Sequence, residues 1–207
     1  MKKIASIIIV LFMVIACKEE SNPLNKIKEA ADSVKEVKQG FENINEVVKG
    51  YEDVEENIKK LTEITPITKE EIKDWMPKEV GDLKRTEFNI ANQMGISTFK
   101  LTFKGEGKKR INITISDGAG NGSAIVSMYM MFQNIDVDKE NEFGYERTQI
   151  FDGQRTLIKY RASQNQEKAT LQCLLNQRFG IEANAWEMTP EELWSFIKKM
   201  NINTLQK

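Results

Sequence analysis

The 207-residue chain contains no histidine. Histidine is the usual base of Ser-His and Cys-His nucleophile pairs and a common metal ligand, so its absence excludes those sites within one chain. Cysteine is almost as scarce, with only Cys17 and Cys173 present. The longest largely apolar stretch, from Ile4 to Ala16 with Ser6 as its one polar residue, falls short of the roughly 20 residues that a membrane-spanning helix needs. The chemistry of this chain must therefore come from other residue types.

The N-terminus has the three regions of a secretory leader. Lys2 and Lys3 give a basic start, the apolar run follows, and a small residue, Ala16, precedes Cys17. The stretch Val14-Ile15-Ala16-Cys17 resembles the lipobox of bacterial lipoproteins. The resemblance implies cleavage before Cys17, a diacylglycerol on its thiol and acylation of the new amine. Residues 1–16 are then the signal peptide, and Cys17 is the lipidation site.

The residues that follow the anchor suggest which membrane holds it. Lys18-Glu19-Glu20-Ser21 lacks the Asp after the lipidated Cys that marks inner-membrane retention in enteric bacteria. The tract resembles the acidic export tract of surface lipoproteins in the Bacteroidota. The resemblance implies an outer-membrane lipoprotein of the cell envelope, with the periplasmic or surface face left open.

Charge and cysteine content limit the partners of the mature chain. With 30 basic and 31 acidic side chains the charge is nearly balanced, and we find no basic stripe of the kind expected for nucleic acid. Once Cys17 is lipidated, Cys173 is the sole thiol and no internal disulfide can form. Because Cys173 alternates with Leu171 and Leu175, we expect it to be a buried small hydrophobe rather than a nucleophile.

Residues 17–63 are predicted to form a lipid anchor followed by a helical stalk. Apolar residues recur three or four positions apart from Leu24 to Leu61, and charged residues fill the other faces. Two extra short steps interrupt the coiled-coil spacing. The stripe is expected to pack on the downstream domain or pair with another helix, and self-association through the stalk stays open. A membrane-surface helix is disfavoured because the segment is net acidic.

Residues 64–207 are predicted to form an α+β domain. Thr68 with Glu71, and Thr189 with Glu192, fit capping boxes that begin two short helices. Between these helices the apolar period changes to two, which predicts an antiparallel sheet. We expect two hairpins, one of residues 98–103 with 111–115 and one of residues 147–151 with 154–160, the second joined by a turn at Asp152-Gly153. Further strands are expected at 171–175, at 179–183 and near Phe88 and Ile90.

The span from Ser123 to Gln133 is too apolar for a surface loop and is predicted to be a buried helix, with a strand as the alternative. The predicted fold is therefore a helical stalk followed by an antiparallel sheet with helices packed on one face. This order resembles the PsbP-like fold in Gly144-Tyr145-Glu146, in the Asp152-Gly153 turn and in Arg178-Phe179 at a late strand. The resemblance carries no catalytic motif and implies a binding or assembly module.

Two loops invite a ligand. The Gly-rich segment 117–123 follows a strand and precedes the predicted helix, where backbone amides could hold a phosphate, but it lacks the Lys of a P-loop. The acidic run 136–142 alternates carboxylates like calcium ligands but lacks the Gly and distant Glu of an EF-hand. We favour a flexible connection for the first and a solvated loop for the second. No catalytic residue, cofactor or metal site is assigned.

Two functions remain from different classes. The favoured one is a non-catalytic envelope lipoprotein whose domain binds a protein or an envelope polymer, with no nucleic-acid partner. The alternative is an envelope hydrolase that works with paired carboxylates, which would need a cleft with two acids of separated pKa. The chain is not predicted to be an enzyme, because without His or a reactive Cys it has few groups that shuttle protons near neutral pH.

Overall fold

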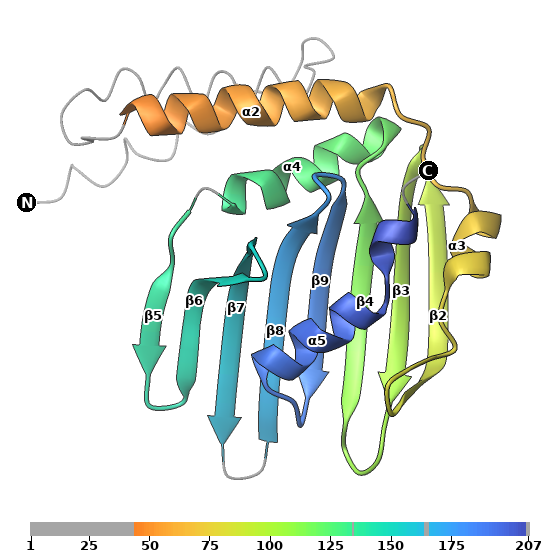
Figure 1. Cartoon of the computed structure of the whole chain (residues 1–207), viewed down its shortest axis with the longest axis vertical. Coiled ribbons are helices and arrows are strands. Elements are labelled where there is room, and N and C mark those ends of the chain that lie inside the picture. The colour runs from red at the N-terminus through yellow and green to blue at the C-terminus, as the bar shows by residue number, and fades with distance from the viewer. Residues whose placement is uncertain (1–43, 134, 164–165, 206–207) are drawn as a thin grey trace, which may run out of the picture. The chain divides into compact units, whose positions relative to one another are not determined.

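A computed structural model of the chain describes residues 44–133, 135–163 and 166–205. Nine strands form one antiparallel sheet in the order β1-β2-β3-β4-β9-β8-β7-β6-β5 (Figure 1). The strand bounds are β1 Glu79–Val80, β2 Leu83–Gln93, β3 Ile96–Lys104, β4 Arg110–Asp117, β5 Asp138–Asn141, β6 Gly144–Phe151, β7 Gln154–Ser163, β8 Gln166–Leu175 and β9 Phe179–Trp186. The helices are α2 Ile44–Thr62, α3 Lys69–Trp75, α4 Ser123–Phe132 and α5 Pro190–Lys199, with short 3₁₀ turns η2 Gly120–Gly122 and η3 Ile202–Leu205. The predicted α+β class with an antiparallel sheet is confirmed.

One face of the sheet carries the main core. Alternate residues of the central strands point to it and are almost fully buried, as the two-residue period requires. They are Phe99, Leu101 and Phe103 on β3, Ile111, Ile113 and Ile115 on β4, and Ile181, Ala183 and Ala185 on β9. Helix α5 covers this face with Leu193, Phe196 and Ile197, and Phe103 meets Phe196 edge-on at 5.0 Å between ring centroids. Helices α3 and η3 extend the cover beside it.

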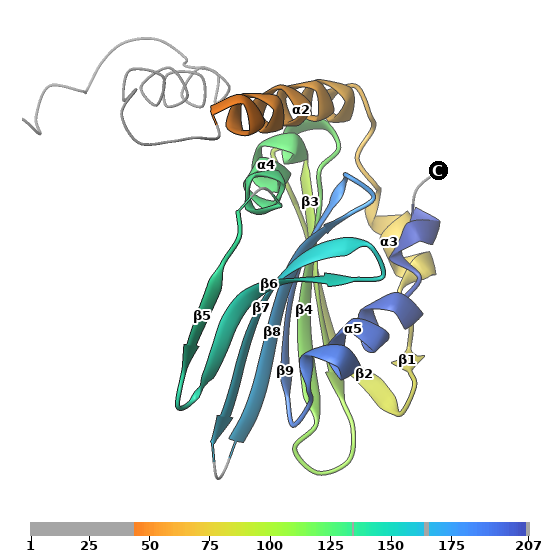
Figure 2. The ribbon, with the colours of Figure 1, turned by 60° about the vertical axis from the view of Figure 1, so that its left-hand side comes forward.

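Helix α4 lies on the opposite face of the sheet. Figure 2 shows α4 on one side of the strands and α5 on the other. A Cβ built on Gly180 would come within 2.7 Å of the Tyr129 ring, so this strand residue is a glycine because the α4 side chain packs directly on the backbone. The prediction that the helices pack on one face is therefore wrong for α4. Helix α4 contacts the sheet on one of its sides and α2 on another, which explains why it is apolar on more than one side.

Helix α2 packs on α4 through the C-terminal part of the apolar stripe that was predicted from Leu24 to Leu61. Val54, Ile58 and Leu61 are buried, with Leu61 only 3% exposed. Packing on the downstream domain is therefore the role that the structure shows for this part of the predicted stalk. Residues 17–43, with the predicted lipidation site Cys17, lie outside the described residues. Among the helices of the described ranges, none is long and apolar enough to cross a membrane.

Local signals in the sequence place the ends of the elements well. Both capping boxes are present, with the Thr68 and Thr189 side chains accepting hydrogen bonds from the backbone N–H groups three residues later. Asp152 and Gly153 both have positive φ, as a two-residue primed turn requires. The short edge strands β1 and β5 were not predicted from the sequence. Strand β5 is exposed along its whole length and carries acidic side chains, which protect a sheet edge from pairing with another chain.

Candidate ligand-binding face

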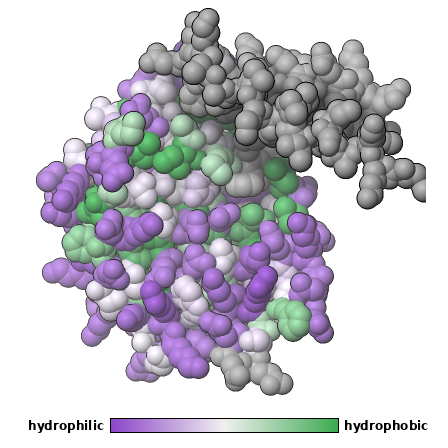
Figure 3. Space-filling view, turned by 180° about the vertical axis from the view of Figure 1, so that it is seen from behind, coloured by the Kyte–Doolittle hydropathy of each residue, from purple (hydrophilic) through white to green (hydrophobic). Residues whose placement is uncertain are grey.

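Among the described residues, helix α4 is the cover of one end of the sheet face opposite α5, and the described helices leave the rest of that face uncovered. We call the surface opposite α5, beyond the part covered by α4, the open face. Its side chains come from the strand positions that alternate with the core residues, and most are polar and partly exposed. Figure 3 views the molecule from this side, and the surface away from α4 is largely hydrophilic.

A row of cations crosses the open face at the end farthest from α4. Strand pairing sets the residues of this row directly opposite one another, strand by strand: Lys84 on β2, Lys104 on β3, Arg110 on β4, Trp186 on β9, Lys168 on β8 and Arg161 on β7. We call this set the cationic row. Five strand spacings of ~4.8 Å make it roughly 24 Å long. Glu79 on β1 lies opposite Lys84 and ends the row on that side.

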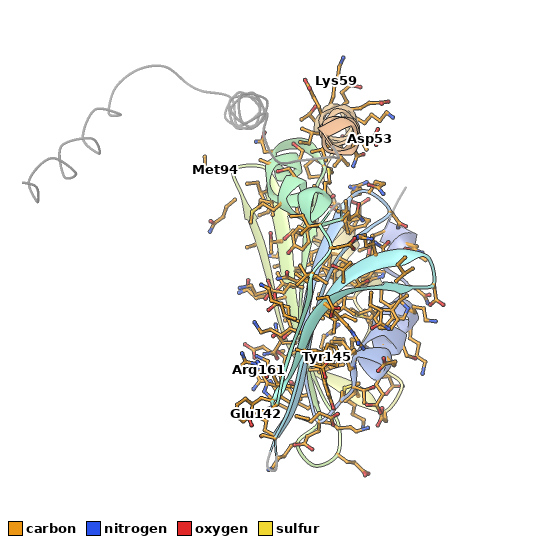
Figure 4. All side chains as sticks on the ribbon, turned by 90° about the vertical axis from the view of Figure 1, so that its left-hand side faces the viewer. Asp53, Lys59, Met94, Glu142, Tyr145 and Arg161 are labelled. Atoms are coloured by element: carbon orange, nitrogen blue, oxygen red, sulfur yellow. The ribbon has the colours of Figure 1, made fainter. Side chains whose placement is uncertain are left out.

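The views of the sheet edge agree with this register. Figure 4 shows Arg161 on the side of the sheet away from α5, whereas Tyr145 lies on the α5 side. Arg161 and Glu142 lie at the same end of the sheet, and Met94 lies near the end where α4 packs. The cationic row and α4 therefore occupy opposite ends of the open face.

Trp186 is the aromatic centre of the row. The Arg110 guanidinium carbon lies 5.5 Å from the centroid of the indole, and the Lys168 ammonium nitrogen lies 5.1 Å from it. Both distances are within the range of a cation–π contact, which holds the cations beside the ring. The indole is partly exposed, so part of the ring is accessible to a ligand. A ring flanked by two cations offers an apolar surface and two positive charges to one ligand.

A second row, made of amides and hydroxyls, runs beside the cations. Its central residues lie two positions along each strand from those of the cationic row, on the side nearer α4. Its central members are Thr102, Asn112, Asn184 and Thr170, again aligned by strand pairing. Thr170 Oγ1 donates to Asn184 Oδ1 at 3.0 Å, and Arg110 Nε donates to Asn112 Oδ1 at 3.0 Å. These bonds orient the amides while leaving further donors and acceptors for a ligand.

The cationic row is electrostatically unfavourable in the free protein. Lys104 lies opposite Lys84 on one side and Arg110 on the other, and Lys168 lies opposite Arg161. Like charges directly opposite in a sheet destabilise it by roughly 0.2–1 kcal/mol per pair. Within the part of the chain that the structure describes, none of the five cations forms an ion pair with an acidic residue. A local conflict that the fold does not relieve is typical of a functional surface.

The most buried charged residues lie elsewhere and have a structural role. Asp117 and Arg178, here named the latch, form a two-bond ion pair, with Nε to Oδ1 at 2.6 Å and Nη2 to Oδ2 at 2.9 Å. Asp117 Oδ2 also accepts from the Ile67 backbone N–H, and Arg178 donates to the Thr65 carbonyl. Buried Ser97 donates to the Ile67 carbonyl at 3.0 Å. Residues 65–67, the strap between α2 and α3, are thereby fixed to the sheet, and sequence reasoning had assigned no role to either latch residue.

The Gly-rich segment 117–123 is a tight buried turn rather than a flexible connection. The backbone N–H groups of Gly118, Ala119 and Gly122 donate to acceptors within the protein, so they are not free to hold a phosphate. A Cβ on Gly122 would lie 1.9 Å from the Asp117 carbonyl oxygen, which explains the glycine. The segment brings Asp117 to Arg178 and starts α4.

The other candidate sites do not converge on a catalytic centre. Asp136 of the acidic run pairs with Arg155, and among the described residues no group of three or more Cys, Asp or Glu is placed to hold a metal ion. Cys173 is buried on the core face, and burial raises the pKa of its thiol to about 12. A small cavity of about 10 Å³ beside Tyr129 and Gln133 has room for about one water molecule and not for a substrate.

Carboxyl groups with altered pKa values do not form a catalytic pair. The pKa of Glu56 is lowered by its hydrogen bond to Lys60, and that of Asp152 by its hydrogen bonds to Lys198 and then Trp194. A general acid needs the opposite shift, because it must hold its proton near neutral pH. The two groups are also on different elements, α2 and the β6–β7 turn, and both are exposed.

Sequence comparison adds no assignment to this geometry. No family model, curated protein sequence or solved structure matches the chain.

Proposed function

We propose that the protein is a non-catalytic lipoprotein of the bacterial outer membrane that binds an envelope partner through the open face. The proposal joins two parts of the chain. The lipobox at Val14 to Cys17 supplies the anchor, and the α+β domain supplies the binding surface. We propose that residues 17–43 tether the domain to the membrane. We also propose that the domain is related to the PsbP-like fold.

The open face is the observation that carries the proposal. Its central strands β4, β9 and β8 lie in the interior of the sheet and are paired on both sides, as are all its strands except β1 and β5. A rigid sheet holds its side chains in fixed positions at little entropic cost, which favours recognition. The cationic row and Trp186 add charge and an apolar ring, which a surface without a partner does not need.

The hydrolase alternative finds less support. It needs two acids that share a cleft and differ in pKa. The acids of the open face lie far apart: Glu87 on β2 and Glu146 on β6 are at opposite ends of one row, and Glu182 on β9 is one row farther. Glu146 also pairs with Lys159 at 3.2 Å.

The anchor is tested by metabolic labelling with a fatty acid. The wild-type protein should carry the label, and Cys17→Ser should abolish it and leave an uncleaved precursor. A Cys17→Ser protein that still carries the label contradicts the lipoprotein assignment.

The binding face is tested by blocking it with a bulky group. In full-chain protein with Cys17→Ser, Lys100→Cys places one exposed thiol on the open face, while buried Cys173 stays unlabelled. Modification with a polyethylene-glycol maleimide should prevent the protein from sedimenting with detergent-washed envelope fragments. Lys199→Cys on α5 is the matched control, because it also replaces one exposed lysine by a thiol but on the covered side. Equal sedimentation of both modified proteins contradicts the use of the open face.

A further inference from the structure

We infer that the cationic row binds an extended anionic glycan, a linear polymer of sugar rings that carry carboxylate or phosphate groups. The inference rests on the proposed function and specifies the ligand of the open face. Five cations and one indole lie along a single line across six strands. Each cation can pair with an acidic group of the polymer, and a charge-assisted hydrogen bond is stronger than a neutral one.

The linear arrangement favours a polymer over a membrane surface. Anionic headgroups form a plane, so a membrane-binding face should be basic over its whole area and carry exposed apolar residues. The row beside the cations instead has Glu87 at one end and Glu146 at the other, and Glu182 lies one row farther. These carboxylates would face the anionic headgroups and repel them. Positive charge is thus concentrated in the cationic row, because Lys159 beside it is paired with Glu146 and Lys100 lies alone two rows away.

The side chains around Trp186 favour a sugar over a nucleobase chain. Proteins that bind single-stranded nucleic acid offer several aromatic rings for successive bases. The described part of the open face offers one indole among amides and hydroxyls. A sugar ring can pack its C–H face on this indole, while its hydroxyls bond with Asn112, Asn184 and Thr170. An acidic substituent would then lie beside Arg110 or Lys168, the two cations that flank the ring.

The free energy of binding should be more favourable for a polymer that carries many anionic groups than for an isolated anion. A single exposed ion pair is worth ~0–1 kcal/mol, and salt screens it over about 8 Å at physiological ionic strength. A polymer engages several cations at once, so later contacts form at a high effective concentration. Binding should therefore require polymer length and should weaken steeply as salt rises.

The probe for the test is polygalacturonate, a linear polymer of sugar acids, with neutral dextran as the uncharged control. Full-chain protein should bind polygalacturonate at low salt and not dextran. The triple variant Lys104→Gln, Arg110→Gln, Lys168→Gln should weaken binding at least tenfold. The triple variant Lys69→Gln, Lys73→Gln, Lys199→Gln removes the same charge from exposed positions on α3 and α5, and should bind as the wild type does.

One further variant and two further ligands separate the outcomes. Trp186→Leu keeps the charges and should weaken glycan binding, whereas a purely electrostatic surface would not respond. Equal loss in both triple variants, or binding of dextran, overturns the inference. It is also overturned if single-stranded DNA, or vesicles of anionic phospholipid, bind through the row while polygalacturonate does not. In either case the Lys100→Cys blocking experiment can still succeed, so failure of the glycan assignment is distinct from failure of the proposed function.

Discussion

Breaking the latch should cost more stability than any exposed ion pair of this protein. Asp117 has no exposed surface and the Arg178 side chain is only 6% exposed. Removing one partner of a buried pair leaves the other charge without compensation and costs roughly 3–5 kcal/mol. We therefore expect Arg178→Met to lower the free energy of unfolding by about 3–5 kcal/mol. The Ile67 and Ala119 amides that still bond to Asp117 place the loss toward the lower part of that range.

Urea denaturation of the full chain, followed by tryptophan fluorescence, measures this loss. Arg155→Met is the control, since Arg155 also pairs with an aspartate, Asp136, but that partner is largely exposed. Amide hydrogen exchange adds a local readout, because Ile67 donates directly to the latch and should lose protection in Arg178→Met. A loss below about 1 kcal/mol, or unchanged protection at Ile67, would refute the assignment of the latch as the clamp of the strap.

Three other expectations follow from the buried residues. Leu61→Ala should lower the free energy of unfolding by about 2–4 kcal/mol in urea, because α2 packs on α4, whereas exposed Glu63→Ala should have little effect. Cys173 should resist thiol reagents at pH 8 in the native protein and react in denaturant, since burial raises its pKa to about 12; fast native labelling would contradict its burial. Burial, and then nearby Glu182, also raise the pKa of Tyr129 to about 12, above the usual 10. Its contribution to stability is fully present below pH 10 and is lost as pH rises toward 12, so Tyr129→Phe should flatten the alkaline limb of a stability curve.

The elements that the sequence predicted are those set by local rules. Alternating apolar residues identified β3, β4, β8 and β9, and the capping threonines placed the starts of α3 and α5. The turn at Asp152-Gly153 was predictable because only a few residue types accept positive φ at both positions. Each of these signals lies within a few residues of the feature that it predicts.

The features that were missed depend on contacts between distant segments. Asp117 and Arg178 are 61 positions apart, and the pattern around each gives no sign of the other. The prediction that all helices pack on one face of the sheet failed for α4. The sequence of an apolar helix does not indicate which face of a sheet the helix covers. The basic residues of the cationic row are scattered from Lys84 to Lys168 on separate strands, and only Arg110 among them stands in a run of three basic residues, Lys108-Lys109-Arg110. Only the order and register of the strands bring them into line.

The two faces of the sheet have different roles, which explains how the fold tolerates the cationic row. Burial of apolar area drives folding, and here it is concentrated on the face that α5 covers. The open face contributes little burial at its far end, so its residues can be chosen for a ligand even where they repel one another. Replacing Lys104 by Gln removes two like-charge contacts and should therefore leave the free energy of unfolding unchanged or raise it by up to about 1 kcal/mol, while glycan binding falls. Urea denaturation and polygalacturonate titration of the same variant measure both effects. A variant that loses stability as well as binding would show that Lys104 is needed for the fold, and that the cationic row is not a surface set apart for a partner.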